Sequence, residues 1–190
     1  MEQKKSVLDR IKKFADKAHG DQMRKYTGQR YIVHPVEVMQ ICSKVTSDLS
    51  VLSAALLHDV LEDTPVTKEE IKTFLQTLMD LESLDRTLNM VIDLTDVYIK
   101  DAFPMLNRRA RKDKEHQRLS TVSPDSQTIK YADIISNSID ISAHDSDFGP
   151  VYLREMKALL KSMDKGNQQL YEKAIETVDM CLKQLNKEFR

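Results

Sequence analysis

The stretch AALLHDVLEDT, residues 54–64, places imidazole and carboxylate side chains directly after an apolar run. The eight residues before His58 are almost all apolar, which is typical of a buried helix, so His58 and Asp59 would leave water together. A buried carboxylate needs a cation or hydrogen bonds, and a divalent ion is the simplest cation that also binds a neutral imidazole nitrogen. The stretch therefore predicts either a metal site or a neutral histidine that is hydrogen-bonded to the aspartate.

A second His-Asp pair tests how informative the dipeptide is by itself. His144 and Asp145 lie in SAHDSDFGP, residues 142–150, which is polar and flanked by glycine and proline. No apolar helix is expected before this pair, and no acidic residue follows it by four positions. We therefore interpret the second pair as part of a solvated turn.

The distribution of apolar residues predicts an all-α fold. Only 4 Gly and 5 Pro occur in 190 residues, and the apolar positions recur at steps of three and four instead of alternating. We expect one domain over residues 1–190, with an exposed helix or a mobile connection between Lys100 and Leu119. The other predicted helices span about 6–20, 35–45, 50–63, 67–78, 84–94, 124–139, 150–163 and 170–185.

Charge and composition exclude several classes of partner. The 29 Lys+Arg balance 30 Asp+Glu for a net charge of -1, so we expect neither nucleic-acid binding nor attraction to a membrane surface. No run of about 18 apolar residues occurs, and we expect no signal peptide, because no apolar core follows the basic residues of the first segment. Cys42 and Cys181 lie in apolar helical patterns, as expected of buried free thiols in a reducing compartment. We therefore expect a cytoplasmic protein, and the sequence gives no prediction of its oligomeric state.

Two more polar residues interrupt apolar helical patterns elsewhere in the chain. His34 lies in YIVHPVEVM and Asp133 in KYADIISN. Together with His58 and Asp59, they would supply two nitrogen and two oxygen donors from three helices, leaving coordination positions free for water. Such a donor set favours manganese or iron and is compatible with zinc. Taken singly, His34 also fits a helix N-terminus, and Asp133 also fits a hydrogen-bonded core acid.

Two acidic residues follow the His-Asp pair by one helical turn. Glu62 would lie beside His58 and Asp63 beside Asp59. Carboxylates in this position would orient or deprotonate a water molecule at a metal ion. The alternative for Glu62 is an exposed acid near the end of its helix.

Four segments of the chain resemble one protein family. These are MRKYTGQRYIVHPVEV (23–38), AALLHDVLEDT (54–64), VIDLTDV (91–97) and KYADIISN (130–137). In order and spacing they resemble the hydrolase domain of RelA/SpoT-type proteins, including the stand-alone small alarmone hydrolases similar to the metazoan SpoT homologue, within the His-Asp phosphohydrolase superfamily. The resemblance covers roughly residues 5 to 165.

The resemblance implies a helical enzyme with one Mn²⁺ ion. Glu62 and Asp63 would position and activate the attacking water. The ion would be held by His34, His58, Asp59 and Asp133.

The implied reaction is removal of the 3′-pyrophosphate of guanosine tetra- or pentaphosphate, giving GDP or GTP and pyrophosphate. Arg24 and Lys25 would pack against the purine and ribose, because a planar guanidinium stacks well on a base. Asn137 would help to place the nucleotide. The chain has no room for a synthetase domain as well, so we expect no alarmone synthesis.

Departures from the family pattern concern the substrate. Val97 and Tyr98 stand where similar stand-alone members have Asp and Lys, and the last part of the chain lacks a clear counterpart of an Arg and a Tyr that some relatives use on the 5′ phosphates. Two alternatives follow: hydrolysis of another nucleotide, such as the 2′-phosphate of NADPH, or a non-catalytic nucleotide-binding sensor. The basic residues between positions 108 and 112 would contact phosphates or, as we expect, form a solvated face; they are Arg108, Arg109, Arg111 and Lys112.

Overall fold

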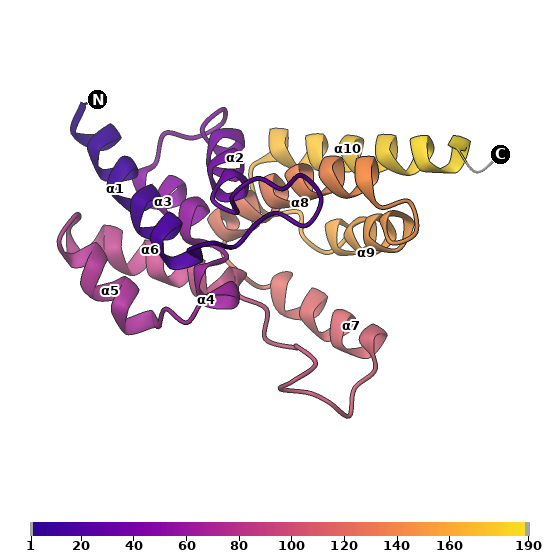
Figure 1. Cartoon of the computed structure of the whole chain (residues 1–190), viewed down its shortest axis with the longest axis horizontal. Helices are drawn as coiled ribbons and strands as arrows, with labels where there is room; N and C mark the ends of the chain where they lie inside the picture. The colour runs from indigo at the N-terminus through magenta and orange to yellow at the C-terminus, as the bar shows by residue number, and fades with distance from the viewer. Residues whose placement is uncertain (1, 189–190) are drawn as a thin grey trace. The chain divides into compact units, whose positions relative to one another are not determined.

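The computed structural model describes the backbone of residues 2–188 and the side chains of residues 4–186, and this part of the chain contains helices and no strand (Figure 1). The all-α prediction is confirmed. The helices are α1 (Glu2–His19), α2 (Val33–Cys42), α3 (Leu49–Leu57), α4 (Val60–Asp63), α5 (Lys68–Gln76), α6 (Leu81–Leu94), α7 (Arg108–Leu119), α8 (Pro124–His144), α9 (Gly149–Leu160) and α10 (Gln168–Glu188).

The chain divides into two compact units, Met1–Thr95 and Asp96–Arg190, each of which is described by itself. The predicted domain over 1–190 also includes Met1, Phe189 and Arg190, which lie outside the described residues. One domain over the whole chain stays a prediction. Among the described helices, none is both long and apolar enough to cross a membrane.

Helix α3 forms the centre of the first unit. It packs against α1, α2 and α6, and every residue from Ser50 to Leu57 is buried. Its N-terminus is capped by Asp48, whose carboxylate accepts hydrogen bonds from the backbone N–H groups of Ser50 and Val51. An apolar helix surrounded on several sides explains why its hydrophobic residues follow no single stripe.

The prediction of one continuous helix from 50 to 63 is wrong, because α3 ends at Leu57 and α4 begins at Val60. The ring Nδ1 of His58 donates to the Ala55 carbonyl at 2.8 Å. In a continuous helix, that carbonyl would accept the N–H of Asp59. Asp59 adopts φ -95° and ψ -6°, in the sparsely populated region where many active-site residues lie. The interruption therefore falls on the His-Asp pair itself.

Helix boundaries elsewhere follow local sequence signals closely. Gly20 ends α1 with a φ of 55°, as predicted. The predicted capping box of Thr67 and Glu70 opens α5. Helix α2 begins at Val33, so Pro35 is its third residue rather than its first. A proline in the first turn loses no hydrogen bond, because the N–H groups there lack helical partners in any case.

In the second unit, α8 packs against α9 and α10. Its predicted start is confirmed, with Ser123 as N-cap and Pro124 as first residue. The buried Tyr131 hydroxyl donates to the Met163 carbonyl at 2.8 Å and accepts from the Gly166 N–H at 3.2 Å. These bonds tie the segment that follows α9 to α8. The predicted burial of the two free thiols, Cys42 and Cys181, is also confirmed.

The segment from 100 to 119 contains turns followed by α7. Several of its charged side chains form hydrogen bonds or ion pairs with residues of other segments. Glu115 is buried and accepts hydrogen bonds from the N–H groups of Val97 and Tyr98 at 3.2 and 3.1 Å. Arg108 forms a bidentate pair with Glu155, and Lys112 pairs with Asp96 at 3.2 Å. Arg108 and Arg109 are exposed, as expected of a solvated face, whereas Arg111 and Lys112 are only partly exposed. Arg108 and Lys112 also pair with carboxylates of other segments.

Candidate metal centre

The helix break after α3 directs two adjacent side chains into one place. His58 is 3% exposed. Its Nδ1 lies 2.8 Å from the Ala55 carbonyl, which only accepts, so Nδ1 carries the proton. The other ring nitrogen, Nε2, then presents a lone pair in the neutral imidazole. A backbone carbonyl that fixes the tautomer in this way is a common feature of metal-binding histidines.

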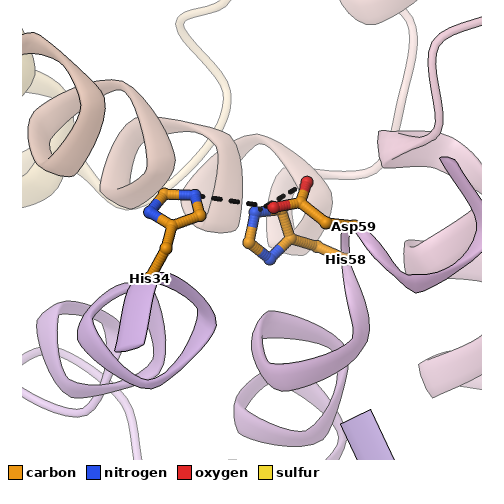
Figure 2. Close-up of side chains that lie close together, drawn as sticks. All are labelled: His34, His58 and Asp59. Carbon is orange, nitrogen blue, oxygen red and sulfur yellow. Dashed lines mark ion pairs between the residues drawn. The ribbon is translucent and has the colours of Figure 1, made fainter. Parts of the chain in front are cut away.

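Three potential ligand atoms converge in the first unit (Figure 2). The His58 Nε2 lies 3.1 Å from the Asp59 Oδ1, and the His34 Nε2 lies 3.6 Å from the Asp59 Oδ2. One donor atom from each of the three residues lies within 4.8 Å of the other two. His34, in the first turn of α2, is 2% exposed, so the cluster is largely withdrawn from water.

The chemistry of this cluster fits a divalent ion. Neutral imidazole nitrogens and a carboxylate direct lone pairs at one another, which is unfavourable unless a cation or a proton lies between them. Two nitrogens and a carboxylate oxygen suit manganese, iron or zinc, and positions would remain for water. The other option left open by the sequence, a histidine hydrogen-bonded to the aspartate, needs a proton on Nε2 as well as on Nδ1. The metal assignment and the set of four ligands stay predictions.

Tyr31 belongs to this cluster and was not identified from the sequence. Its hydroxyl donates to the Asp59 Oδ2 at 2.8 Å, and its ring packs edge-on to His34 at 6.0 Å between centroids. Burial and the negative charges of Asp59 and Asp63 raise the pKa of Tyr31 far above its usual value, so the group stays a neutral donor. The available signal was its position, one helical turn before His34 in the YIVHPVEV motif.

The two predicted catalytic acids lie in α4, as the sequence spacing requires. Glu62 and Asp63 are both exposed. Although Asp63 is exposed as a residue, partial withdrawal of its carboxyl from water and the charge of Asp59 raise its pKa, while hydrogen bonds from Tyr31 and Gln22 act in the opposite direction. The structure thus places Asp63 in the same hydrogen-bonded cluster as Asp59, whereas the role of Glu62 stays a prediction.

Arg24 and Lys25 lie in the loop between α1 and α2. The loop folds back on itself, with a bridge between Met23 and Arg30 and an Arg24 N–H bond to the Gln29 carbonyl at 2.8 Å. The Lys25 ammonium lies 2.9 Å from the Tyr26 hydroxyl and 4.6 Å from the centre of its ring. The loop is therefore ordered by its backbone, and nucleotide contacts from its two cations stay a prediction.

Asp133 and Asn137 lie in α8, in the second unit. Asp133 is 6% exposed, and its carboxylate accepts from the Lys130 ammonium at 2.9 Å and from the Asn137 amide at 2.7 Å. Burial alone would lower the pKa of Lys130, but the charges of Asp133 and Asp96 outweigh it and raise that pKa. Within its own unit Asp133 is a satisfied buried acid, and its role as fourth ligand and that of Asn137 in nucleotide binding stay predictions.

The second His-Asp pair differs from the first in burial and in the partners of its side chains. His144 is the last residue of α8, so the predicted turn begins only at Asp145. The His144 side chain is 42% exposed, and its Nδ1 interacts with the Asp140 carbonyl and carboxylate. Asp145 accepts from the Phe148 N–H at 2.9 Å. Solvent exposure is as predicted, and the pair forms a helix terminus instead of a ligand cluster.

The sequence model of the HD-domain family matches residues 12–119 of the chain. The chain is a member of the HD-domain family, which confirms the superfamily expected from its motifs. The matched range includes all three residues of the cluster.

Sequence relatives with a named activity match shorter parts of the chain. The chain is 48% identical over 65 residues to the guanosine-3′,5′-bis(diphosphate) 3′-pyrophosphohydrolase of Aquifex aeolicus, covering 34% of this chain and 9% of the relative. It is 52% identical over 54 residues to the Vibrio cholerae protein of that name, covering 28% and 8%. It is 44% identical over 59 residues to the bifunctional (p)ppGpp synthase/hydrolase RelA of Mycobacterium tuberculosis, covering 31% and 8%. The similarity spans less than a tenth of each relative.

Two solved structures share the fold. A metazoan ortholog of SpoT, described as hydrolysing ppGpp, superposes with a TM-score of 0.76 at 23% identity, over 94% of either chain. A Listeria monocytogenes protein superposes with a TM-score of 0.59 at 19% identity, over 79% of this chain and 99% of its own. The helical HD fold expected from the resemblance is therefore confirmed.

Proposed function

We propose that this protein is a metal-dependent phosphohydrolase that removes the 3′-pyrophosphate of guanosine tetra- or pentaphosphate. Water adds to the phosphorus attached to the 3′ oxygen, the bond between them breaks, and the 3′ oxygen gains a proton, so that GDP or GTP and pyrophosphate are released. The observation on which this proposal rests is the convergence of His34, His58 and Asp59 on one point of an HD-family fold. The names of the curated relatives indicate the nucleotide.

We assign one Mn²⁺ ion to His34, His58, Asp59 and Asp133, with iron or zinc as alternative metals. A divalent ion at this place would lower the pKa of a bound water molecule and offset negative charge on a phosphoryl oxygen. The protein would hold the ligands in place through the Ala55 carbonyl, which orients His58, and the Tyr31 hydroxyl, which orients Asp59.

The remaining residues divide between proton transfer and substrate binding. Asp63 and Glu62 would accept the proton of the attacking water. Arg24 and Lys25 would bind the purine and ribose from the loop before α2. Asn137 would contact the nucleotide from α8. We also predict that the protein is cytoplasmic.

One observation supports a change of substrate as the second candidate. Val97 and Tyr98 stand where similar proteins have an acid and a lysine. The backbone N–H groups of both residues donate to the Glu115 carboxylate. Tyr98 packs against Phe103 at 4.9 Å between ring centroids, and its ring lies under the Lys114 ammonium. A segment that lacks the family's acid and lysine would recognise a different phosphate arrangement, such as the 2′-phosphate of NADPH.

The test is a substrate panel with protein purified in the presence of Mn²⁺. We expect release of pyrophosphate from guanosine tetraphosphate, measured by coupled phosphate detection after pyrophosphatase. Orthophosphate from NADPH without pyrophosphate from the tetraphosphate would select the second candidate. Turnover only with other nucleotides would reject the alarmone assignment and leave a change of substrate as the candidate.

The Asp59→Ala variant separates an enzyme from a nucleotide-binding sensor. An enzyme loses turnover together with its metal, which elemental analysis measures on the same sample. A sensor shows nucleotide binding by calorimetry and no turnover even before the substitution. Asp145→Ala, in the second His-Asp pair, is the matched control and should retain both metal and turnover.

A further inference from the structure

One buried histidine near the candidate metal centre has no part in the proposed ligand set. His19 is the last residue of α1 and is 6% exposed. Its Nδ1 lies 2.9 Å from the Gln22 Oε1, and its Nε2 is buried without a hydrogen-bond partner among the described residues. A buried polar atom without a partner destabilises the folded state. An apolar side chain would avoid that cost, so packing alone does not account for a histidine here.

The surroundings of His19 connect it to Asp63 through Gln22. Because Gln22 uses its oxygen to accept from His19, its amide NH₂ group points the other way, and Gln22 hydrogen-bonds the Asp63 carboxylate. The backbone holds Gln22 in this position: its N–H donates to the His19 carbonyl at 3.0 Å, and its carbonyl accepts from the Tyr31 N–H at 2.9 Å. The rings of His19 and Tyr31 pack together at 4.6 Å.

The orientation of the Gln22 amide decides whether a hydrogen-bond donor or an acceptor faces the Asp63 carboxylate. The amide oxygen and nitrogen occupy nearly the same space, so a rotation of 180° exchanges a donor for an acceptor. In the reversed orientation the Gln22 oxygen would face the Asp63 oxygens and repel them. The contact between the His19 Nδ1 and the Gln22 Oε1 requires the tautomer with the proton on Nδ1. In that tautomer His19 selects the productive orientation, since an N–H group can bond only to the oxygen end of the amide.

We propose that His19 is a positioning residue: it fixes the orientation of the Gln22 amide, and this amide in turn holds the Asp63 carboxylate where it acts on water. The inference rests on the proposed function for the role of Asp63. The hydrogen-bonded chain itself runs from α1 through the following loop to α4, entirely within the first unit.

Three variants separate positioning from packing. His19→Phe keeps a ring against Tyr31 and removes both nitrogens, and we expect kcat to fall about tenfold with KM and manganese content within about twofold of the wild type. His19→Asn places an amide N–H near the position of Nδ1, and we expect it to recover most of kcat. Gln22→Glu brings a second carboxylate to Asp63, and we expect the greatest loss of the three.

The matched control is His116→Phe. His116, in α7 of the second unit, is another histidine whose buried Nε2 forms no hydrogen bond in the part of the chain that the structure describes. The same substitution there should leave kcat unchanged. Thermal unfolding of each variant shows whether the fold is retained.

A second measurement keeps the inference testable if guanosine tetraphosphate is not a substrate. The side-chain NH₂ signals of Gln22, assigned by comparison with Gln22→Glu, should move in His19→Phe and return in His19→Asn. Unchanged Gln22 signals in His19→Phe would overturn the inference whether or not the wild type turns over. If the signals move as expected but the wild type hydrolyses no nucleotide, the proposed function fails and the positioning of Gln22 stands. With an active wild type, a His19→Phe kcat equal to the wild-type value would also overturn the inference.

Discussion

The two His-Asp pairs of this chain have the same letters and opposite environments. Both histidines contact a backbone carbonyl through Nδ1 at 2.8 Å, but the His58 side chain is 3% exposed, whereas the His144 side chain is 42% exposed and also lies beside the Asp140 carboxylate. Asp59 lies within reach of two imidazoles and a tyrosine hydroxyl, whereas Asp145 accepts from a backbone N–H at a helix end. The dipeptide by itself therefore predicts little.

The difference arises from the residues that precede each pair. The apolar run before His58 forms a central helix, so the helix break occurs inside the packed part of the first unit. Before His144, α8 has already become partly exposed, as at Ile139, which is 49% exposed. A helix that ends in the interior presents its last polar groups to one another, while a helix that ends at the surface presents them to water.

The largest effect should come from exchanging the histidine in each pair for glutamine. His58→Gln removes a proposed metal ligand, and we expect loss of bound manganese and a fall in turnover of more than about 100-fold, because even residues that only support a ligand cost 10–100-fold. His144→Gln should change neither quantity. Elemental analysis and a turnover assay on the two purified variants make the comparison, and equal behaviour of the two variants would remove the distinction drawn between the pairs.

The next effect concerns the fourth proposed ligand. Asp133→Asn should weaken manganese binding by about tenfold or more, since a neutral amide is a poorer ligand than a carboxylate for a hard cation. Asp140→Asn, in the same helix beside His144, is the control and should bind manganese like the wild type. Calorimetric titration of manganese into both variants gives the affinities. If Asp133→Asn binds as tightly as the control, Asp133 is only the buried partner of Lys130.

Two tyrosine variants separate an effect on manganese affinity from an effect on the free energy of unfolding. Tyr31→Phe removes the donor to Asp59 and should weaken manganese binding about tenfold. Tyr131→Phe leaves the Gly166 N–H and the Met163 carbonyl without this partner and should lower the free energy of unfolding by about 1–2 kcal/mol. Denaturant unfolding and manganese titration of both variants should show two separate losses. A loss of manganese affinity in Tyr131→Phe would contradict this division.

The smallest effect is a pH dependence of stability at His116. Burial and the nearby charge of Lys112 hold the pKa of His116 below its usual 6.5, against the opposing charges of Asp113, Glu155 and Glu115. The unfolded chain then binds the proton more readily, so stability is complete above pH 6.5 and falls as the pH drops from there to the folded-state pKa. Thermal unfolding at several pH values should show this slope reduced in His116→Gln. An unchanged slope in His116→Gln would contradict the assignment.

Much of the fold was predictable because its signals are local. Gly20 ends α1, Thr67 and Glu70 cap α5, and Ser123 with Pro124 opens α8, each within a few residues of sequence. The helix break at His58 was not predictable, since it depends on a ring nitrogen that takes the place of a backbone donor. Burial of Glu115 was also missed, because its partners are backbone groups 17 and 18 residues away in a strongly charged sequence.

By itself the sequence determined the all-helical fold, the HD family and the identity of His34, His58 and Asp59 as a group, because apolar periodicity and motif spacing are properties of nearby residues. Only the tertiary structure decided that Tyr31 bonds Asp59 and that Gln22 connects His19 to Asp63. Those contacts join α1, the following loop and α4, and their distances depend on how the helices pack rather than on their separation along the chain.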